Sequence, residues 1–144
     1  MCGVVRVDRI TLRSFLSQYE QDTFEWGRTD CIHFVARWIE YNNLSLFDDF
    51  SAWDYSDVQT ARKSYVKFLR SHKARSVTDV LDQYYTRVSH IPMSGGIVAK
   101  RSHSTLGRAL GIVEDPRGLF MDYDGIKSLP LDPDKDLYWW INDE

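Results

Sequence analysis

The spacing of apolar residues changes halfway along the chain, and this change constrains the fold more than any other feature of the sequence. In the first half, apolar residues recur every three or four positions, which is the spacing of amphipathic helices. After about residue 94, short runs rich in Val, Ile and Leu alternate with Pro and Gly turn signals. Helices followed by strands that short turns connect predict an α+β fold with an antiparallel sheet.

Four stretches of the first half carry a helical pattern, and each begins with a candidate capping residue. These residues are Thr11, Asp30, Ser56 and Ser76. The second helix is expected from Cys31 to about Tyr41. The apolar stripes of the first three helices are Leu12, Phe15, Leu16 and Tyr19; Phe34, Val35, Trp38 and Ile39; and Val58, Ala61, Tyr65 and Leu69. Ser76 and Asp79 have the spacing of a capping box before Val80, Leu81 and Tyr84.

The second half contains four predicted strands, within residues 95–100, 106–115, 119–124 and 126–131, and residues 136–142 could add a fifth. The DPRG segment at Asp115 is typical of a type I turn with Pro116 in its second position, and Asp124-Gly125 is a hairpin signal. A chain of 144 residues without a linker fits one domain. We therefore expect a single domain over residues 1–144, with N-terminal helices packed on a C-terminal antiparallel β-meander.

Composition excludes several classes of function. Charged residues make up 27% of the chain, but the net charge is only −3, so overall charge gives no reason to expect nucleic acid or an anionic membrane as a partner. No run approaches 18 apolar residues, so no membrane span is expected. The N-terminus lacks the pattern of a signal peptide, and Cys2 and Cys31 are interpreted as free thiols of a protein made in a cytoplasm.

Cys31 is the first candidate for chemistry, in the segment WGRTDCIHF. A thiol at a helix N-terminus lies near unpaired N–H groups and the positive end of the helix dipole, both of which stabilise a thiolate. The same position lies on the stripe of Phe34, Val35 and Trp38, where a cysteine can serve as a small buried hydrophobe. Position in the sequence alone leaves both interpretations open.

A nucleophilic cysteine needs a base, usually a histidine that a third polar group orients. His33 is two residues along the same helix and should point away from Cys31. His72 is expected at the end of the third helix, where a cation favours the dipole, and His90 in the loop before the sheet. His103, just ahead of the second strand or within it, is the best candidate base, although each of these can be an ordinary surface histidine.

Metal and phosphate sites find little support. Asp132, Asp134 and Asp136 resemble the start of a calcium loop, but Leu137 stands where the loop needs Gly, and no acidic residue occupies the twelfth position. The histidines lack i,i+4 ligand spacing, and Gly95-Gly96 precedes a strand rather than a helix. We expect a solvated turn at these aspartates and neither metal nor cofactor.

Several motifs in this order resemble the NlpC-type cell-wall cysteine peptidases of the papain-like superfamily. They are WGRTDC at a helix start, then the strands GGIV, ALGIVED and LFMDYDGI. The likeness spans roughly residues 10–142, and it is greatest to small NlpC-like proteins found in phages and prophages beside tail genes. It implies a papain-like fold in which a helix-start cysteine attacks peptide bonds of peptidoglycan. It also implies a histidine base that opens a strand, and an orienting polar residue on the next strand.

Carried onto this chain, the resemblance makes Cys31 the nucleophile, places the base at Ala109 and places the third residue near Asp122. Alanine cannot accept a proton, and Gly96 stands where the family often has aspartate. Only His103, six residues upstream of Ala109, offers a replacement base.

Three functions follow from the resemblance. The first is a virion protein of the tail tip or baseplate hub that uses a degenerate peptidase scaffold as a structural module among other tail proteins. The second is an active peptidase or amidase that cleaves peptidoglycan during genome delivery with Cys31, His103 and Asp122. The third is a tail assembly factor. In the first two functions, the protein is made in the host cytoplasm and is then part of the assembled tail.

Overall fold

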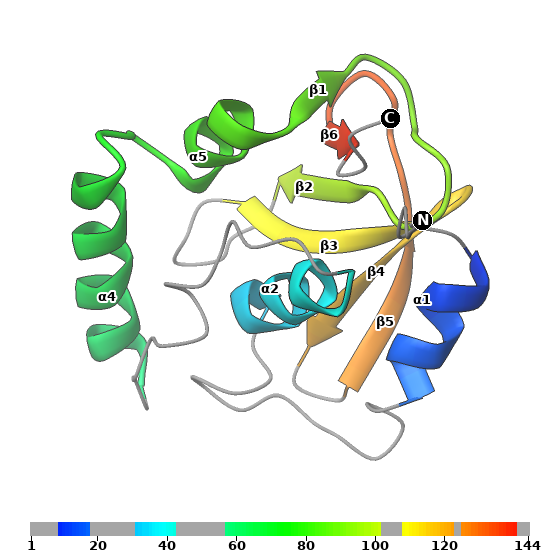
Figure 1. Cartoon of the computed structure of the whole chain (residues 1–144), viewed down its shortest axis with the longest axis horizontal. Helices are drawn as coiled ribbons and strands as arrows, with labels where there is room; N and C mark the ends of the chain where they lie inside the picture. Colours follow the sequence, from blue (N-terminus) through cyan, green and yellow to red (C-terminus); the bar gives the residue numbers. More distant parts are fainter. Residues whose placement is uncertain (1–8, 18–30, 43–56, 102–107, 123–124, 141–144) are drawn as a thin grey trace, which may run out of the picture.

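The computed structural model describes residues 9–17, 31–42, 57–101, 108–122 and 125–140 of the chain. Its helices are α1 (Arg9–Leu16), α2 (Cys31–Tyr41), α4 (Val58–Ser71) and α5 (Val77–Tyr84). Its strands are β1 (Thr86–Val88), β2 (Ile97–Arg101), β3 (Arg108–Glu114), β4 (Arg117–Asp122), β5 (Gly125–Pro130) and β6 (Leu137–Trp140). Helices precede strands along the chain, and the predicted α+β class is confirmed (Figure 1).

The strands form one six-stranded antiparallel sheet in the order β1-β6-β2-β3-β4-β5. Strands β2 to β5 are consecutive neighbours, as the predicted meander requires, and β6 returns to lie between β1 and β2. Strand β1 was not predicted; it has only three residues and pairs Thr86 with Trp140 near the other end of the chain. So short a strand has no detectable period of its own, and its partner is not local.

Side chains alternate across the sheet and build two separate apolar clusters. The helix-side cluster combines Leu110 and Ile112 of β3 with residues of all four helices. The opposite cluster consists of Val98, Val113, Phe120 and Tyr138 with Val88, Ile91, Ala109 and Leu131 around them, and no helix residue belongs to it among the described residues. All four helices therefore pack on one face of the sheet, because successive strand residues point to opposite faces.

Helix starts agree with the sequence analysis in part. The bounds of α2 are confirmed, whereas α1 begins at Arg9, so Thr11 is a helix residue and not a cap. The cap of α4 is Asp57 instead of Ser56, because the Asp57 carboxylate accepts from the Thr60 N–H (2.8 Å) and Thr60 Oγ1 accepts from the Asp57 N–H (3.3 Å). Asp30 lies outside the described residues.

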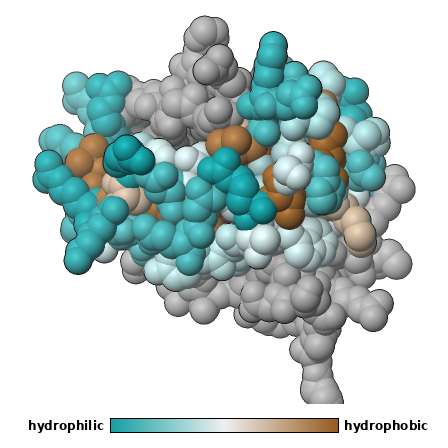
Figure 2. Space-filling view, turned by 90° about the horizontal axis from the view of Figure 1, so that it is seen from above, coloured by the Kyte–Doolittle hydropathy of each residue, from teal (hydrophilic) through white to brown (hydrophobic). Residues whose placement is uncertain are grey.

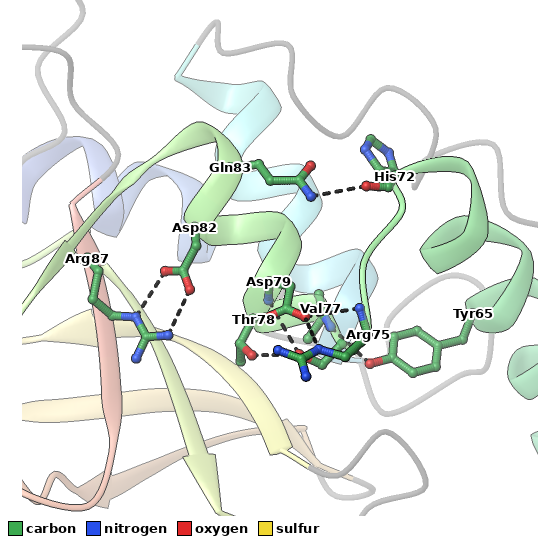
Figure 3. A network of polar contacts seen from close by, with 10 residues as sticks. Tyr65, His72, Arg75, Val77, Thr78, Asp79, Asp82, Gln83 and Arg87 are labelled. Carbon is green, nitrogen blue, oxygen red and sulfur yellow. Dashed lines mark hydrogen bonds and ion pairs between the residues drawn. The ribbon is translucent and has the colours of Figure 1, made fainter.

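The capping of α5 is confirmed with one change. Ser76 Oγ accepts from the Asp79 N–H at 3.4 Å, as expected for an N-cap. The Asp79 carboxylate accepts from the backbone N–H of Arg75 (3.0 Å), one residue before the cap, as Figure 3 shows. Tyr84 at the end of this helix is half exposed.

The two predicted turns have different outcomes. The type I turn at DPRG is wrong, because the Asp115–Pro116 peptide bond is cis and Pro116 occupies the third position of the turn between Glu114 and Arg117. The hairpin between β4 and β5 is confirmed, with Asp122 paired to Gly125. Gly125 opens β5 with a φ of 109°, a conformation that favours glycine. No helix in the described part of the chain is long and apolar enough to cross a membrane.

Candidate active site

Cys31 is the first residue of α2, as the sequence predicts. The backbone N–H groups of the first helical turn have no partners within the helix, and they concentrate positive potential at this point. The side chain of Cys31 lies outside the described residues. The predicted position of the thiol-bearing residue at a helix start is therefore confirmed, while its role as a nucleophile stays a prediction.

The core holds α2 in place from two sides. Phe34, Val35, Trp38 and Ile39 are buried, which confirms the predicted stripe, and the helix packs against β3 and β4. The indole N–H of Trp38 donates to the carbonyl of Gly95, just before β2, at 2.8 Å. In Figure 1, α2 crosses in front of β3 and β4, and its first residues lie on the side where β3 begins. The start of α2 therefore has a fixed position relative to the sheet.

Ala109, at the expected base position, lies on the wrong face of the sheet for a base. It is half-buried in β3 and packs with the cluster on the face opposite α2. The residues of β3 that belong to the helix-side cluster are Leu110 and Ile112, and both are buried. Neither of these two side chains can accept a proton. Ala109 therefore lacks a proton-accepting group, and its side chain also points away from α2.

His103 lies outside the described residues, but the strands on either side of it are described. Arg101, the last residue of β2, pairs with Arg108, the first residue of β3, and Lys100 pairs with Ala109. The segment that carries His103 therefore leaves and rejoins the sheet beside Ala109.

Asp122 is the last residue of β4, and its side chain lies outside the described residues. The recorded pairing of β3 with β4 matches Ile112 with Leu119. Continued toward the start of β3, this register brings Ala109 level with Asp122. The recorded pairs themselves end at Ile112 and Leu119, three residues short of Ala109 and Asp122.

The other three histidines are His33, His72 and His90, and each lies in a different environment. His33 is 2% exposed within α2, so its interpretation as a surface residue is wrong. His72 caps the end of α4, as expected, and its ring lies 4.5 Å from the ring of Phe68, centroid to centroid. His90 is exposed and follows β1, so its predicted place before the sheet is also wrong.

Gly96 is required by packing. A Cβ at this position would lie 2.6 Å from Cγ of Pro92 and 3.1 Å from the carbonyl oxygen of Trp139. The carbonyl of Gly96 also accepts from the Val113 N–H at 2.7 Å, which fixes the backbone. The family's aspartate therefore does not fit at residue 96 in this chain without a shift of the neighbouring residues.

The acidic turn before β6 is only partly solvated, which corrects the prediction. Asp132 Oδ1 accepts from the backbone N–H groups of Asp134 (2.8 Å) and Lys135 (3.2 Å), and these bonds lower the pKa of Asp132. Asp136 is buried, and its Oδ2 accepts from the Asp132 N–H (2.9 Å) and from Nζ of Lys100 (3.2 Å). The carboxylates serve the turn, and among the described residues no group of three metal-ligating side chains forms.

One family model matches the chain over residues 6–139, and its description is "Domain of unknown function (DUF6950)". The match covers nearly the whole chain, so the protein belongs to the DUF6950 family. No curated protein and no solved structure matches the sequence.

Proposed function

We propose that this protein is a phage or prophage virion protein of the tail tip or baseplate hub. In this proposal the chain keeps a papain-like, NlpC-type scaffold as a packing module and performs little or no hydrolysis. The support is a cysteine at the first position of a helix that packs on an antiparallel sheet, combined with the order of motifs in the sequence.

One observation carries the non-hydrolytic part of the proposal. Ala109 occupies the base position and faces away from α2, while the β3 side chains toward α2 are Leu110 and Ile112. A thiol without a base loses general-base assistance worth about 10²- to 10⁴-fold in rate. Such a scaffold keeps its shape and loses its chemistry.

The test of the virion role is to locate the chain in particles. Mass spectrometry of purified virions from the phage that encodes it should detect the chain, and electron cryomicroscopy should place it at the tail tip in contact with other tail proteins. Muropeptide release by the wild type should equal release by Cys31→Ala. A monomer that never enters particles would contradict the proposal.

An engineered base sharpens the test. Ala109→His restores the family's residue type, yet the imidazole would project to the face opposite α2. We therefore expect no gain in muropeptide release from Ala109→His. A gain that requires Cys31 would mean that residue 109 does reach the thiol.

A second candidate function is a peptidase or amidase with Cys31 as nucleophile, His103 as base and Asp122 as orienting residue. The favouring observation is that Arg101 and Arg108, on either side of the segment with His103, are paired next to Ala109. Cys31→Ala and His103→Ala should then abolish muropeptide release, while His90→Ala, a change at an exposed histidine, should leave it intact. Equal loss in all three variants would reject this assignment.

The alkylation rate of Cys31 as a function of pH separates the two candidates without a substrate. In a Cys2→Ser background, the structural module should react like an ordinary thiol, half ionised near about pH 8.5. A rate that stays high below about pH 7 would indicate a thiolate stabilised by a cationic partner and favour the peptidase. The double variant Cys2→Ser/Cys31→Ser gives the background rate.

A third candidate, a tail assembly factor, differs from the first only in where the chain ends up. It predicts the chain in assembly intermediates and its absence from mature virions, which the same mass spectrometry measures.

A further inference from the structure

Helix α4 presents a stripe of basic side chains on its outer side. The stripe consists of Gln59, Arg62, Lys63, Val66, Lys67 and Arg70, which line an open hollow of about 680 Å³. These positions recur every three or four residues and extend about 16 Å, at a rise of about 1.5 Å per residue. All six side chains are exposed, and Val66, with 40% of its surface accessible, lies among the four cations.

The opposite side of α4 is attached to the protein core. Phe68 is buried, and Tyr65 and Leu69 pack against the helix-side cluster. The hydroxyl of Tyr65 accepts from the Val77 N–H (3.0 Å), and the amide of Gln83 donates to the His72 carbonyl (3.0 Å), as Figure 3 shows. These contacts fix α4 against α5, so the basic stripe faces outward on a supported helix.

Charge is strongly segregated along the chain. Residues 58–78 contain six Lys and Arg and no Asp or Glu, whereas the remaining residues contain 12 Lys and Arg and 21 Asp and Glu. The small net charge of −3 thus hides a local charge of +6 within a remainder of −9. Figure 2 shows the α4 end of the molecule, at the left, as a mainly hydrophilic surface with a small hydrophobic area.

Within the described part of the chain, the charge of Lys63 helps to lower the pKa of Asp57, after the hydrogen bonds from Thr60, but no close partner pairs with the cations of the stripe. Among the described residues, the side chains of Arg62, Lys63, Lys67 and Arg70 make no hydrogen bond or ion pair. Arg75, just after the helix, does pair with Asp79 at 3.7 Å. Four like charges on three helical turns repel one another, and an external anion would relieve that repulsion.

We propose that the basic stripe of α4 binds an acidic amphipathic helix of a partner protein. In that helix, Asp and Glu side chains would flank a central apolar residue that packs on Val66. A helix laid along α4 matches the length of the stripe, and its carboxylates meet Arg62, Lys63, Lys67 and Arg70 around an apolar centre. This inference rests on the charge and geometry of α4 and holds whether or not the chain enters virions or Cys31 is reactive.

The charge pattern favours a compact acidic partner over a long polyanion. Nucleic acid or an anionic membrane extends beyond the stripe and meets the rest of the chain, whose net charge is −9. The stripe also offers no aromatic ring on which a base could stack, and the apolar face of α4 is occupied by the core instead of being free for a bilayer. A short acidic helix avoids both difficulties.

The test uses the full chain and four fluorescent or light-scattering probes. The first is a helical peptide of about 18 residues with Glu around a central Leu; the second has the same composition scrambled so that Glu and Leu no longer share a face. The third is a DNA duplex, and the fourth is vesicles that contain phosphatidylserine. We expect the patterned peptide to bind most tightly, and at least about tenfold more tightly than its scrambled form.

Paired variants locate the binding. Lys63→Glu/Arg70→Glu should weaken the patterned peptide at least about tenfold, and Val66→Ser should weaken it less. The control Arg13→Glu/Lys127→Glu makes the same change in charge at exposed positions on α1 and β5 and should leave binding unchanged. Raising NaCl from about 0.1 to about 1 M, which shortens the Debye length from about 10 Å to about 3 Å, should also weaken binding.

Several results would overturn the proposal. They are no binding of the patterned peptide, equal binding of the scrambled peptide, tighter binding of DNA or vesicles, or no effect of Lys63→Glu/Arg70→Glu. Self-association of the chain that this variant abolishes would assign the stripe to a second copy and reject a separate partner. None of these results bears on virion incorporation or on Cys31, so the proposed function would stand or fall separately.

Discussion

The two faces of the sheet are stabilised in different ways. The helix side is covered by large apolar residues from α1, α2, α4 and α5, and the Trp38 indole of α2 donates a buried hydrogen bond to the Gly95 carbonyl. The opposite side has a smaller cluster, closed by the segment 131–136, in which Asp136 is buried against Lys100. Packing dominates the first face, whereas a charged turn completes the second.

This difference explains where chemistry can and cannot occur. On the helix side, the central strand β3 contributes the apolar residues Leu110 and Ile112, and α2 contributes Trp38. Polar groups gather instead at the ends of strands and in turns, where the backbone is exposed. The proposed partner of Cys31, His103, belongs to the connection between β2 and β3, at the ends of these two central strands.

The largest expected loss of stability comes from a substitution in the packed, helix-side face. Trp38→Ala removes a side chain with 0% exposure and its hydrogen bond to Gly95, and it should lower the free energy of unfolding by about 3–5 kcal/mol. Trp38→Phe keeps most of the ring and should cost less. Urea denaturation followed by circular dichroism measures both, and a loss under about 1 kcal/mol for Trp38→Ala would refute dominance of packing on this face.

The next largest loss of stability is expected from a substitution in the charged turn before β6. Asp136→Ala removes the acceptor of the Asp132 N–H and one of two acceptors of Lys100 Nζ, which keeps its bond to the Pro130 carbonyl (3.0 Å). It should cost about 2–3 kcal/mol, because Lys100 is partly exposed and can be hydrated again. The matched control is Asp134→Ala, an exposed carboxylate in the same turn, which should change stability by less than about 0.5 kcal/mol. Equal effects in the two variants would show that the buried carboxylate does not hold the turn.

A smaller effect probes the same face through pH. Burial, with the nearby carboxylates of Asp136 and Asp132, raises the pKa of Tyr138 to about 12 from its ordinary value of 10.0. Between these values the unfolded chain releases a proton that the folded chain retains, so stability should fall as pH rises from about 10 to about 12. Tyr138→Phe should remove this phenol's part of the alkaline loss and, through its lost bond to the Asp132 carbonyl, cost about 0.5–1.5 kcal/mol at neutral pH.

Local patterns in the sequence predicted most helices and strands. The features that were not predicted depend on contacts between residues far apart in the sequence. The stripe of α2 and the strands β2 to β6 are visible as periods of apolar residues. Burial of Asp136 depends on Lys100, which the pairing of β2 with β6 brings close, and no local signal reports it. His33 likewise reads as polar in the sequence, but helix α2 is buried around most of its circumference.

The candidate site divides in the same way. The sequence placed Cys31 at a helix start and identified Ala109 as a position without a base. It did not give the face on which Ala109 lies, because that depends on the register of β3 against β2. It also did not reveal the basic stripe of α4 as a surface, since whole-chain charge averages over it.

The smallest expected effect concerns an exposed ion pair. It tests whether solvent exposure determines how much an ion pair contributes to the free energy of unfolding. Arg87 makes a bidentate pair with Asp82 (2.9 and 2.8 Å) at the surface between α5 and β1, and Asp82 also accepts from the Trp139 indole at 2.8 Å. The bond from Arg87, and then that from Trp139, lowers the pKa of Asp82 from its ordinary 3.8. The carboxylate's stabilising contribution is therefore present above about pH 4 and lost as pH falls through its folded value.

Because both side chains of this pair are more than a third exposed, Arg87→Ala should cost only about 0–1 kcal/mol at neutral pH, against the larger loss for Asp136→Ala. High salt should reduce the effect of Arg87→Ala further, while the loss from Asp136→Ala should persist, because a buried pair is screened less than an exposed one. Thermal unfolding of both variants at about 0.1 and about 1 M NaCl measures the contrast. If Arg87→Ala lowered the free energy of unfolding as much as Asp136→Ala, exposed ion pairs on the α5 side would contribute to stability alongside packing. The distinction between the two faces would then fail.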